Sequence, residues 1–96
     1  MKNGLGDLAV TLSLFPTDKG GRLGPTPNVW FGCLMVIDGK NFDVRLDLRE
    51  VGSISPGQTV NVPVSFLDWE FAKDYCTLGK KFFLREVHMI GEGLIE

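Results

Sequence analysis

Cysteine and histidine are scarce in this chain, and their scarcity limits the chemistry available to it. The 96 residues include only Cys33, Cys76 and His88 of these types. A structural zinc site needs four ligands, often in paired C-x-x-C motifs, and a secreted disulfide scaffold needs many cysteines. We therefore expect no metal ion or other cofactor. We also expect both cysteines to be reduced and buried, because free cysteine packs as a small hydrophobic residue.

Long apolar segments are also missing. No run approaches the roughly 20 residues that a membrane-spanning helix requires. Residues 1–7 (MKNGLGD) lack the apolar region of a signal peptide. These absences predict a cytoplasmic protein with no membrane association.

Basic charge is not in excess. The sequence has 10 lysines and arginines against 12 aspartates and glutamates, which gives a net charge of −2. Proteins that bind nucleic acid through its phosphates need a basic surface. Non-specific nucleic-acid binding is therefore disfavoured, although a local basic patch remains open as an alternative.

No motif in the sequence predicts catalysis. The phosphate-binding loop G-x-x-x-x-G-K-[ST] is absent, so we expect no binding or hydrolysis of guanine nucleotide. Cys33, Cys76 and His88 are the only candidates for a nucleophile and its base. Two core cysteines and one strand histidine explain them more simply. We expect a protein that is not an enzyme and has no catalytic residues.

The pattern that dominates the chain is an alternation of apolar and polar residues, which is typical of strands with one buried face. It predicts strands at about residues 8–14, 29–37, 42–49 and 60–66, a fifth that begins near residue 82, and a sixth at 89–95. The second of these is apolar on both faces. The inward residues are predicted to include Val10, Leu12, Val44, Leu46, Val62, Val64, Phe82 and Leu84. Asp43, Arg45, Asp47 and Arg49 are predicted to face outward.

Short strands separated by glycine- and proline-rich turns indicate an all-β domain. Closure into a barrel is favoured because it removes the sheet edges that an open sheet would expose. We therefore predict a six-stranded closed antiparallel β-barrel. It forms a single domain over residues 1–96, and residues 1–6 are expected to be a flexible segment.

Four segments, in order, resemble the C-terminal barrel of the elongation factor Tu family. They are residues 17–22 (TDKGGR), the S-P-G turn at 55–57 with the valine-rich strand after it, residues 79–86 (GKKFFLRE) and residues 90–95 (IGEGLI). Together they span roughly residues 7–95. The resemblance implies a stand-alone barrel of the elongation factor Tu C-terminal type, without the GTPase domain.

In that family the barrel packs on the GTPase domain and contacts the T-arm of aminoacyl-tRNA. The resemblance therefore implies a translation-related role and makes Lys19 and Arg22 candidates for RNA contact. Of the tRNA-facing positions only Arg22 carries over, since Leu23 and Gly24 replace a His-Thr pair and residues 30–40 lack the family's arginines and threonines. For Arg22 a structural role at the barrel rim is favoured over contact with a partner.

Residues 67–78 (LDWEFAKDYCTL) replace a shorter connection of the family and add three aromatic rings, Trp69, Phe71 and Tyr75. Exposed aromatic residues dominate protein-binding hot spots, but closure of one barrel mouth by this segment, as a lid, is favoured over partner contact. An extended start would turn Trp69 and Phe71 towards the core and leave Tyr75 exposed.

The function predicted from the sequence is a non-enzymatic protein-binding or adaptor module. Its partner is expected to be a protein that contacts Trp69, Phe71, Tyr75 or Arg22. A small barrel that binds tRNA or rRNA is the alternative, and a small enzyme that uses His88 and a cysteine is the third hypothesis.

Overall fold

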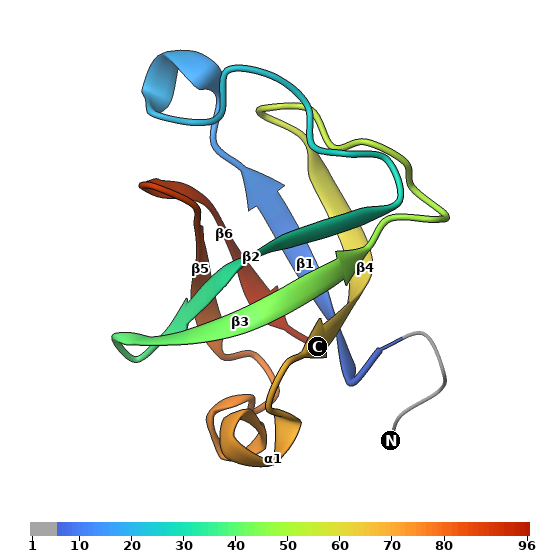
Figure 1. Cartoon of the computed structure of the whole chain (residues 1–96). Helices are drawn as coiled ribbons and strands as arrows, with labels where there is room; N and C mark the ends of the chain where they lie inside the picture. The colour runs from blue at the N-terminus through green and yellow to red at the C-terminus, as the bar shows by residue number, and fades with distance from the viewer. Residues whose placement is uncertain (1–5) are drawn as a thin grey trace.

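The computed structural model describes residues 6–96 of the chain, which form a closed barrel of six antiparallel strands (Figure 1). The strands are β1 (Leu8–Leu14), β2 (Trp30–Ile37), β3 (Lys40–Asp47), β4 (Thr59–Phe66), β5 (Lys81–Arg85) and β6 (Met89–Ile95). Their order around the barrel is β1-β4-β3-β2-β5-β6, and β6 pairs with β1 to close it. The predicted fold class is confirmed. Residues 1–5 of the expected flexible segment lie outside the described residues, and Gly6 is buried.

The alternating pattern places the predicted inward residues in one core. Each of the eight is 6% exposed or less. The core also takes in Met35 and Ile37 from β2, together with Leu48 and Ile54 from the loop after β3, which are all fully buried. The inward face read from the sequence is thus confirmed.

Asp47 is an exception to the predicted outward set, because its side chain is only 5% exposed. Arg49 folds back over it. The Arg49 Nη2 donates to Oδ2 at 2.7 Å, while the Arg49 Nε and backbone N donate to Oδ1 at 3.0 and 3.1 Å. These hydrogen bonds hold the pKa of the Asp47 carboxyl below its ordinary value. The alternation therefore predicted the direction of the Asp47 side chain, but it did not predict that Arg49 would cover the carboxylate.

The turn between β2 and β3 is a tight hairpin at Asp38 and Gly39, both with positive φ (52° and 78°). Ile37 pairs with Lys40 across it. This pair fixes which residues of β2 direct their backbone groups towards β3, since the direction alternates along a strand. Pro63, which cannot donate a ladder hydrogen bond, lies one residue beyond the last β3–β4 pair, Leu46–Val64, and its partner on β1 is Ala9.

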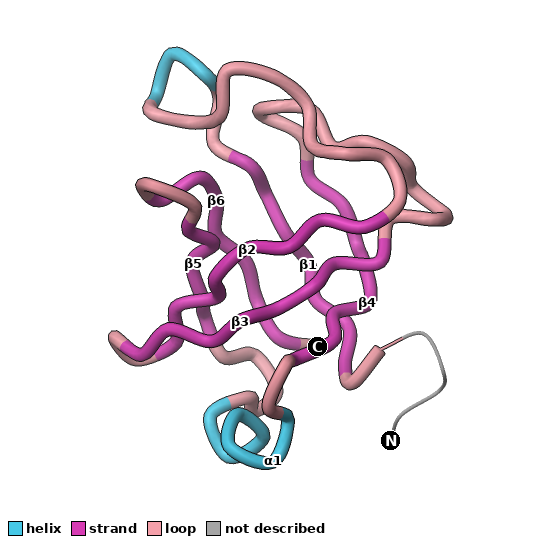
Figure 2. Tube along the Cα trace, in the orientation of Figure 1, coloured by secondary structure: helices cyan, strands magenta, loops and turns pink. Residues whose placement is uncertain are grey.

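Loops and short helical turns cover both ends of the barrel (Figure 2). At one end lie α1 (Trp69–Ala72) and the 3-10 turn η2 (Lys73–Tyr75). At the other end lie the long β1–β2 connection, which contains the 3-10 turn η1 (Thr17–Lys19), and the β3–β4 connection. Thr26 and Ile54 join these two loops, with Thr26 N donating to Ile54 O and Ile54 N donating to Thr26 Oγ1. No helix within residues 6–96 has the length and apolarity needed to cross a membrane.

Candidate functional site

The aromatic segment after β4 begins with a helical turn. The chain leaves β4 at Phe66, and α1 begins at Trp69 with Asp68 as its N-cap. The Asp68 Oδ1 accepts a hydrogen bond from the backbone N of Phe71 at 3.2 Å, which satisfies one of the free amides at the helix start. The extended start predicted from the sequence is therefore wrong. A weak helical periodicity in the sequence of residues 69–78 agrees with this turn.

The three predicted rings lie in one cluster at this end of the barrel, with different exposure. Trp69 packs on Phe66 (ring centroids 5.5 Å apart) and Tyr75 packs on Phe42 (5.2 Å), and both contact the buried core. Phe71 also contacts Phe42 but remains 54% exposed. The expectation of an exposed Tyr75 and a buried Phe71 is wrong, because the helical turn directs Phe71 outward.

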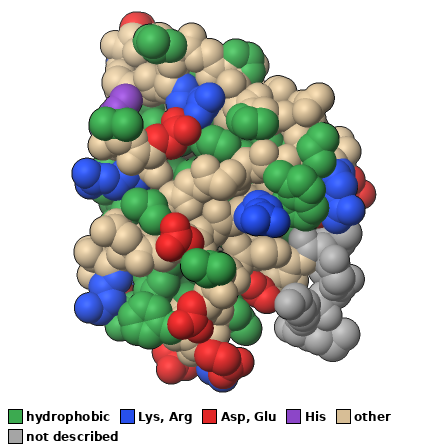
Figure 3. Space-filling model, in the orientation of Figure 1, with side chains coloured by type: hydrophobic (Ala, Val, Ile, Leu, Met, Phe, Trp, Pro, Cys, Tyr) green, Lys and Arg blue, Asp and Glu red, His purple; other side chains and the backbone are tan. Residues whose placement is uncertain are grey.

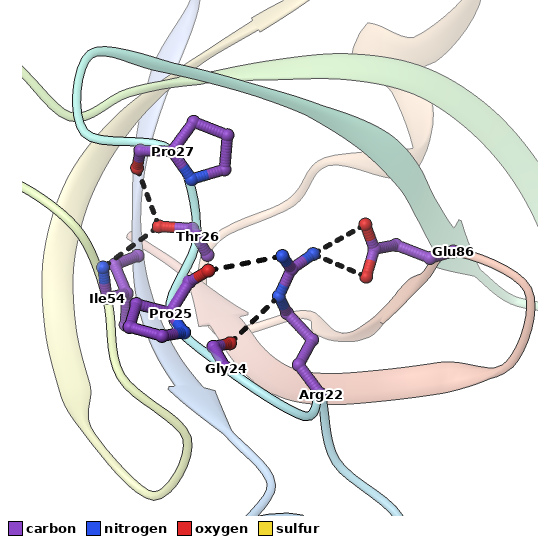
Figure 4. A network of polar contacts seen from close by, with 7 residues as sticks. All are labelled: Arg22, Gly24, Pro25, Thr26, Pro27, Ile54 and Glu86. Atoms are coloured by element: carbon purple, nitrogen blue, oxygen red, sulfur yellow. Dashed lines mark hydrogen bonds and ion pairs between the residues drawn. The ribbon is translucent and has the colours of Figure 1, made fainter.

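Arg22 is held by four acceptors at the opposite end of the barrel (Figure 4). Its Nη1 lies 2.6 Å from each carboxylate oxygen of Glu86, its Nε donates to Gly24 O and its Nη2 donates to Pro25 O, both at 3.2 Å. The guanidinium also lies over the Phe31 ring, 5.1 Å from the centroid. This arrangement ties the β1–β2 loop to the β5–β6 turn.

Lys19 and Arg22, the two candidates for RNA contact, do not form a joint basic patch. Lys19 is exposed on η1, next to Asp18. The side chain of Arg22 is only 21% exposed and its charge is balanced by Glu86. A phosphate would have to displace that carboxylate to reach the guanidinium.

The barrel wall is incomplete where β2 meets β5. Their ladder contains only the pairs Leu34–Arg85, Met35–Leu84 and Val36–Phe83. Trp30 and Gly32 extend beyond it. By the alternation fixed at the Ile37–Lys40 pair, their backbone N–H and C=O groups point away from β3. No strand within the described part of the chain pairs with this edge.

A shallow groove of about 900 Å³ lies on the outer surface beside this free edge. It runs across β2 and β3 from the β5–β6 turn to the end of β4. Its lining residues are Trp30, Gly32, Cys33, Leu34, Asp43, Val44, Arg45, Ser65, Phe66, Leu67, Arg85, Glu86 and Val87. We call this surface the β2–β3 groove. In the view of Figure 3, hydrophobic, basic and acidic side chains intermingle over the face that β2 and β3 cross in Figure 1.

Several groove side chains are apolar and exposed to an unusual degree. Trp30 is 41% exposed, Leu67 is 83% exposed and Val87 is 88% exposed. The guanidinium groups of Arg45 and Arg49 lie 5.9 and 5.0 Å from the centroid of the Trp30 ring. These contacts hold the ring against the barrel surface and leave it available to a ligand.

Two arginines of the groove have no acidic partner among residues 6–96. They are Arg45 on β3 and Arg85 at the end of β5, and both are exposed. Glu86, by contrast, is already paired with Arg22. An incoming carboxylate would therefore meet free guanidinium groups in this groove.

The two cysteines are free thiols, and both are partly buried. Burial, with a smaller contribution from the nearby charge of Glu86, raises the pKa of the Cys33 thiol to about 12. Burial and the charge of Asp7 raise the pKa of Cys76 to about 11. An activated nucleophile requires the opposite shift. Within residues 6–96 no group of three or more His, Cys, Asp or Glu is placed to hold a metal ion.

Sequence reasoning did not single out the β2–β3 groove. The signal was the second strand, which is apolar on both faces, because a barrel strand needs only one apolar face. The glycine in the middle of that strand was a further signal. Neither could reveal that the β2–β5 ladder stops at Leu34, since ladder length depends on how the β5–β6 turn packs.

No protein-family model matches the chain, and a search of curated proteins finds no relative. The structure is compatible with the small barrel domain expected from the sequence. The resemblance to elongation factor Tu therefore rests on the four motifs alone.

Proposed function

We propose that this protein is a non-enzymatic protein-binding module and that its partner binds in the β2–β3 groove. The observation that carries the proposal is the conjunction of a free strand edge with exposed Trp30, Leu67 and Val87 along one groove. Exposed aromatic and aliphatic side chains beside unpaired backbone groups are the elements from which peptide-binding surfaces are built.

The aromatic segment after β4, residues 67–78, enlarges this surface. Leu67 lines the groove, and its backbone N donates a hydrogen bond to the backbone O of Asp43. Asp43 is the residue that follows Phe42 on β3. Phe71 packs on Phe42 with its ring half exposed. In this proposal Phe71 extends the contact area. Trp69 and Tyr75 hold residues 67–78 against the barrel at one end, and Arg22 holds the β1–β2 loop in place at the other end.

The four sequence motifs support a more specific form of the proposal. They favour a partner among the cytoplasmic proteins of translation that touch the elongation factor Tu barrel, such as an exchange factor, the GTPase domain or a toxin that targets translation. A non-enzymatic role is supported by the raised pKa values of Cys33 and Cys76, which disfavour nucleophilic chemistry at physiological pH.

Site-specific cross-linking tests the proposal. A photo-reactive residue at Val87, in the groove, is expected to form a discrete adduct with one protein in a host extract. The same residue at Leu23, which is 95% exposed in the rim loop, is the matched control and should form none. The identified partner is then purified, and its affinity is measured by calorimetry with Trp30→Ala. An affinity unaffected by Trp30→Ala, or equal adducts at both positions, would contradict the proposal.

A further inference from the structure

Gly32 is a glycine that the fold itself does not require. Apart from Gly24 in the β1–β2 loop, the other described glycines have either a positive φ or a backbone neighbour within 3.0 Å of the Cβ that a side chain would add. They are Gly6, Gly20, Gly21, Gly39, Gly52, Gly57, Gly79, Gly91 and Gly93. A Cβ at Gly32 would meet nothing closer than Val44 O at 4.0 Å, and its φ is not positive. A larger residue would fit there and would also have a higher strand propensity.

A glycine inside a strand weakens it and often marks the close approach of a ligand or another backbone. Here Gly32 leaves a hollow in the β2–β3 groove. Trp30 and Leu34 flank the hollow along β2, and Arg45 lies opposite Gly32 on β3. The fourth side is the free edge. The missing side chain therefore opens the groove at the point where β2 has no neighbour.

The free edge and the hollow together fit an extended peptide. Trp30 and Gly32 offer outward N–H and C=O groups to an added strand, which would continue past the end of the β2–β5 ladder. Neighbouring strands lie about 4.8 Å apart. A side chain on the added strand opposite Gly32 would thus face Arg45 across a strand position that carries no side chain.

Outside the Arg22–Glu86 pair, the groove carries two cations, Arg45 and Arg85, and one anion, Asp43, so its charge favours an acidic peptide. Arg45 lies opposite Gly32 on β3, with its guanidinium 5.9 Å from the centroid of the Trp30 ring at the border of the hollow. Arg85 lies at the last pair of the β2–β5 ladder, next to the point where an added strand would begin. Neither forms an ion pair with residues 6–96, whereas Glu86 is neutralised by Arg22. A carboxylate accepts two parallel hydrogen bonds from a guanidinium, which makes arginine well suited to bind it.

We propose that the β2–β3 groove binds an extended acidic segment of a protein partner, which adds a strand to β2 at Trp30 and Gly32 and places its carboxylates on Arg45 and Arg85. The proposal rests on the protein-binding function above and specifies the chemistry of the partner. Asp43, which lines the same groove, disfavours a continuous track of phosphates, so a nucleic acid fits the groove less well than a peptide with spaced carboxylates.

A titration followed by two-dimensional ¹H–¹⁵N NMR tests the proposal with a defined probe. The probe is a short blocked peptide in which glutamate and threonine alternate. Saturable shifts are expected at Trp30, Gly32 and the Nε of Arg45. A lysine–threonine peptide of the same length should bind at least about tenfold more weakly, and so should the glutamate peptide with N-methylated alternate amides.

Two pairs of variants locate the site. Gly32→Leu fills the hollow and is expected to weaken binding at least about tenfold without loss of fold, whereas Gly24→Leu, at a rim glycine that also has open space around it, should leave binding unchanged. Arg45→Gln combined with Arg85→Gln should also weaken binding about tenfold, and Lys19→Gln, on exposed η1, should not.

The outcomes separate this inference from the proposed function. Equal binding of the acidic and basic peptides, or binding that Gly32→Leu does not change, would overturn the inference. So would stronger shifts of the same residues by bulk tRNA. If any of these results is obtained while the photo-reactive residue at Val87 still forms its discrete protein adduct, the groove binds a protein of different chemistry. If no such adduct forms either, the proposed protein-binding function is contradicted as well.

Discussion

At the scale of single residues, Arg22 shows how a residue that looks suited to binding can be used by the fold. The Gly-Gly-Arg motif left two roles open, a rim contact and a partner contact. The guanidinium meets Glu86, Gly24 O, Pro25 O and the Phe31 ring, which leaves it little capacity for another ligand. The geometry favours the structural role.

This role gives a prediction. Arg22→Ala should destabilise the protein by about 2 kcal/mol, because it removes charge-assisted hydrogen bonds and leaves Glu86, which is 34% exposed, without its cation. Urea unfolding followed by circular dichroism measures the change. Glu86→Ala should cost a similar amount, and the double variant should cost less than the sum of the two. Additive costs, or a change for Arg22→Ala below about 0.5 kcal/mol, would argue against the structural role.

At the scale of secondary-structure elements, the strands were predictable and the cap was not. A barrel strand has one face towards the solvent and one towards the core, so the period of two alone sets the direction of its side chains. The alternation is clear for Val44, Leu46, Val62 and Val64. Residues 67–78 lack that constraint. There the Asp68 side chain caps a helical turn by accepting a hydrogen bond from Phe71 N, and this turn exchanges the positions expected for Phe71 and Tyr75 relative to the solvent.

The α1 turn predicts opposite effects of two neighbouring aromatic substitutions. Trp69→Ala should cost about 2–4 kcal/mol, because the ring packs on Phe66 and on the core. Phe71→Ala should cost less than about 1 kcal/mol, since the ring is half exposed, and its main effect should be on partner binding. Chemical denaturation of both variants measures this difference. Equal costs would show that Phe71 belongs to the core and does not form part of the contact surface.

At the scale of the whole molecule, closure of the barrel depends on the approach of β6 to β1. A Cβ at Gly93 would lie 2.2 Å from Thr11 O, and one at Gly91 would lie 2.7 Å from Ser13 O. Glycines inside a strand mark a close backbone approach or a bend, but the sequence does not identify the neighbours of these two. What it could not supply is the length of each ladder, which is long for β1–β4 and short for β2–β5. The free edge of β2 beside the candidate groove follows from the short β2–β5 ladder.

Because the strand ladders close into a barrel, a single core joins all six strands. A disruptive substitution at the centre of this core should therefore destabilise the whole barrel. Leu46 is fully buried on β3, with Phe31 opposite it on β2 and Val64 opposite it on β4. Leu46→Asp places a carboxylate there without a partner, which costs several kcal/mol, about half or more of the stability of a typical domain. We expect this variant to lose its dispersed NMR spectrum and its cooperative unfolding transition.

Asn41→Asp introduces the same charge at an exposed position of β3 and should change stability by less than about 0.5 kcal/mol. A native-like spectrum for Leu46→Asp would mean that β3 tolerates a shift of register that exchanges its two faces, and the positions of Arg45 and Asp43 in the groove would then have to be reassigned as well.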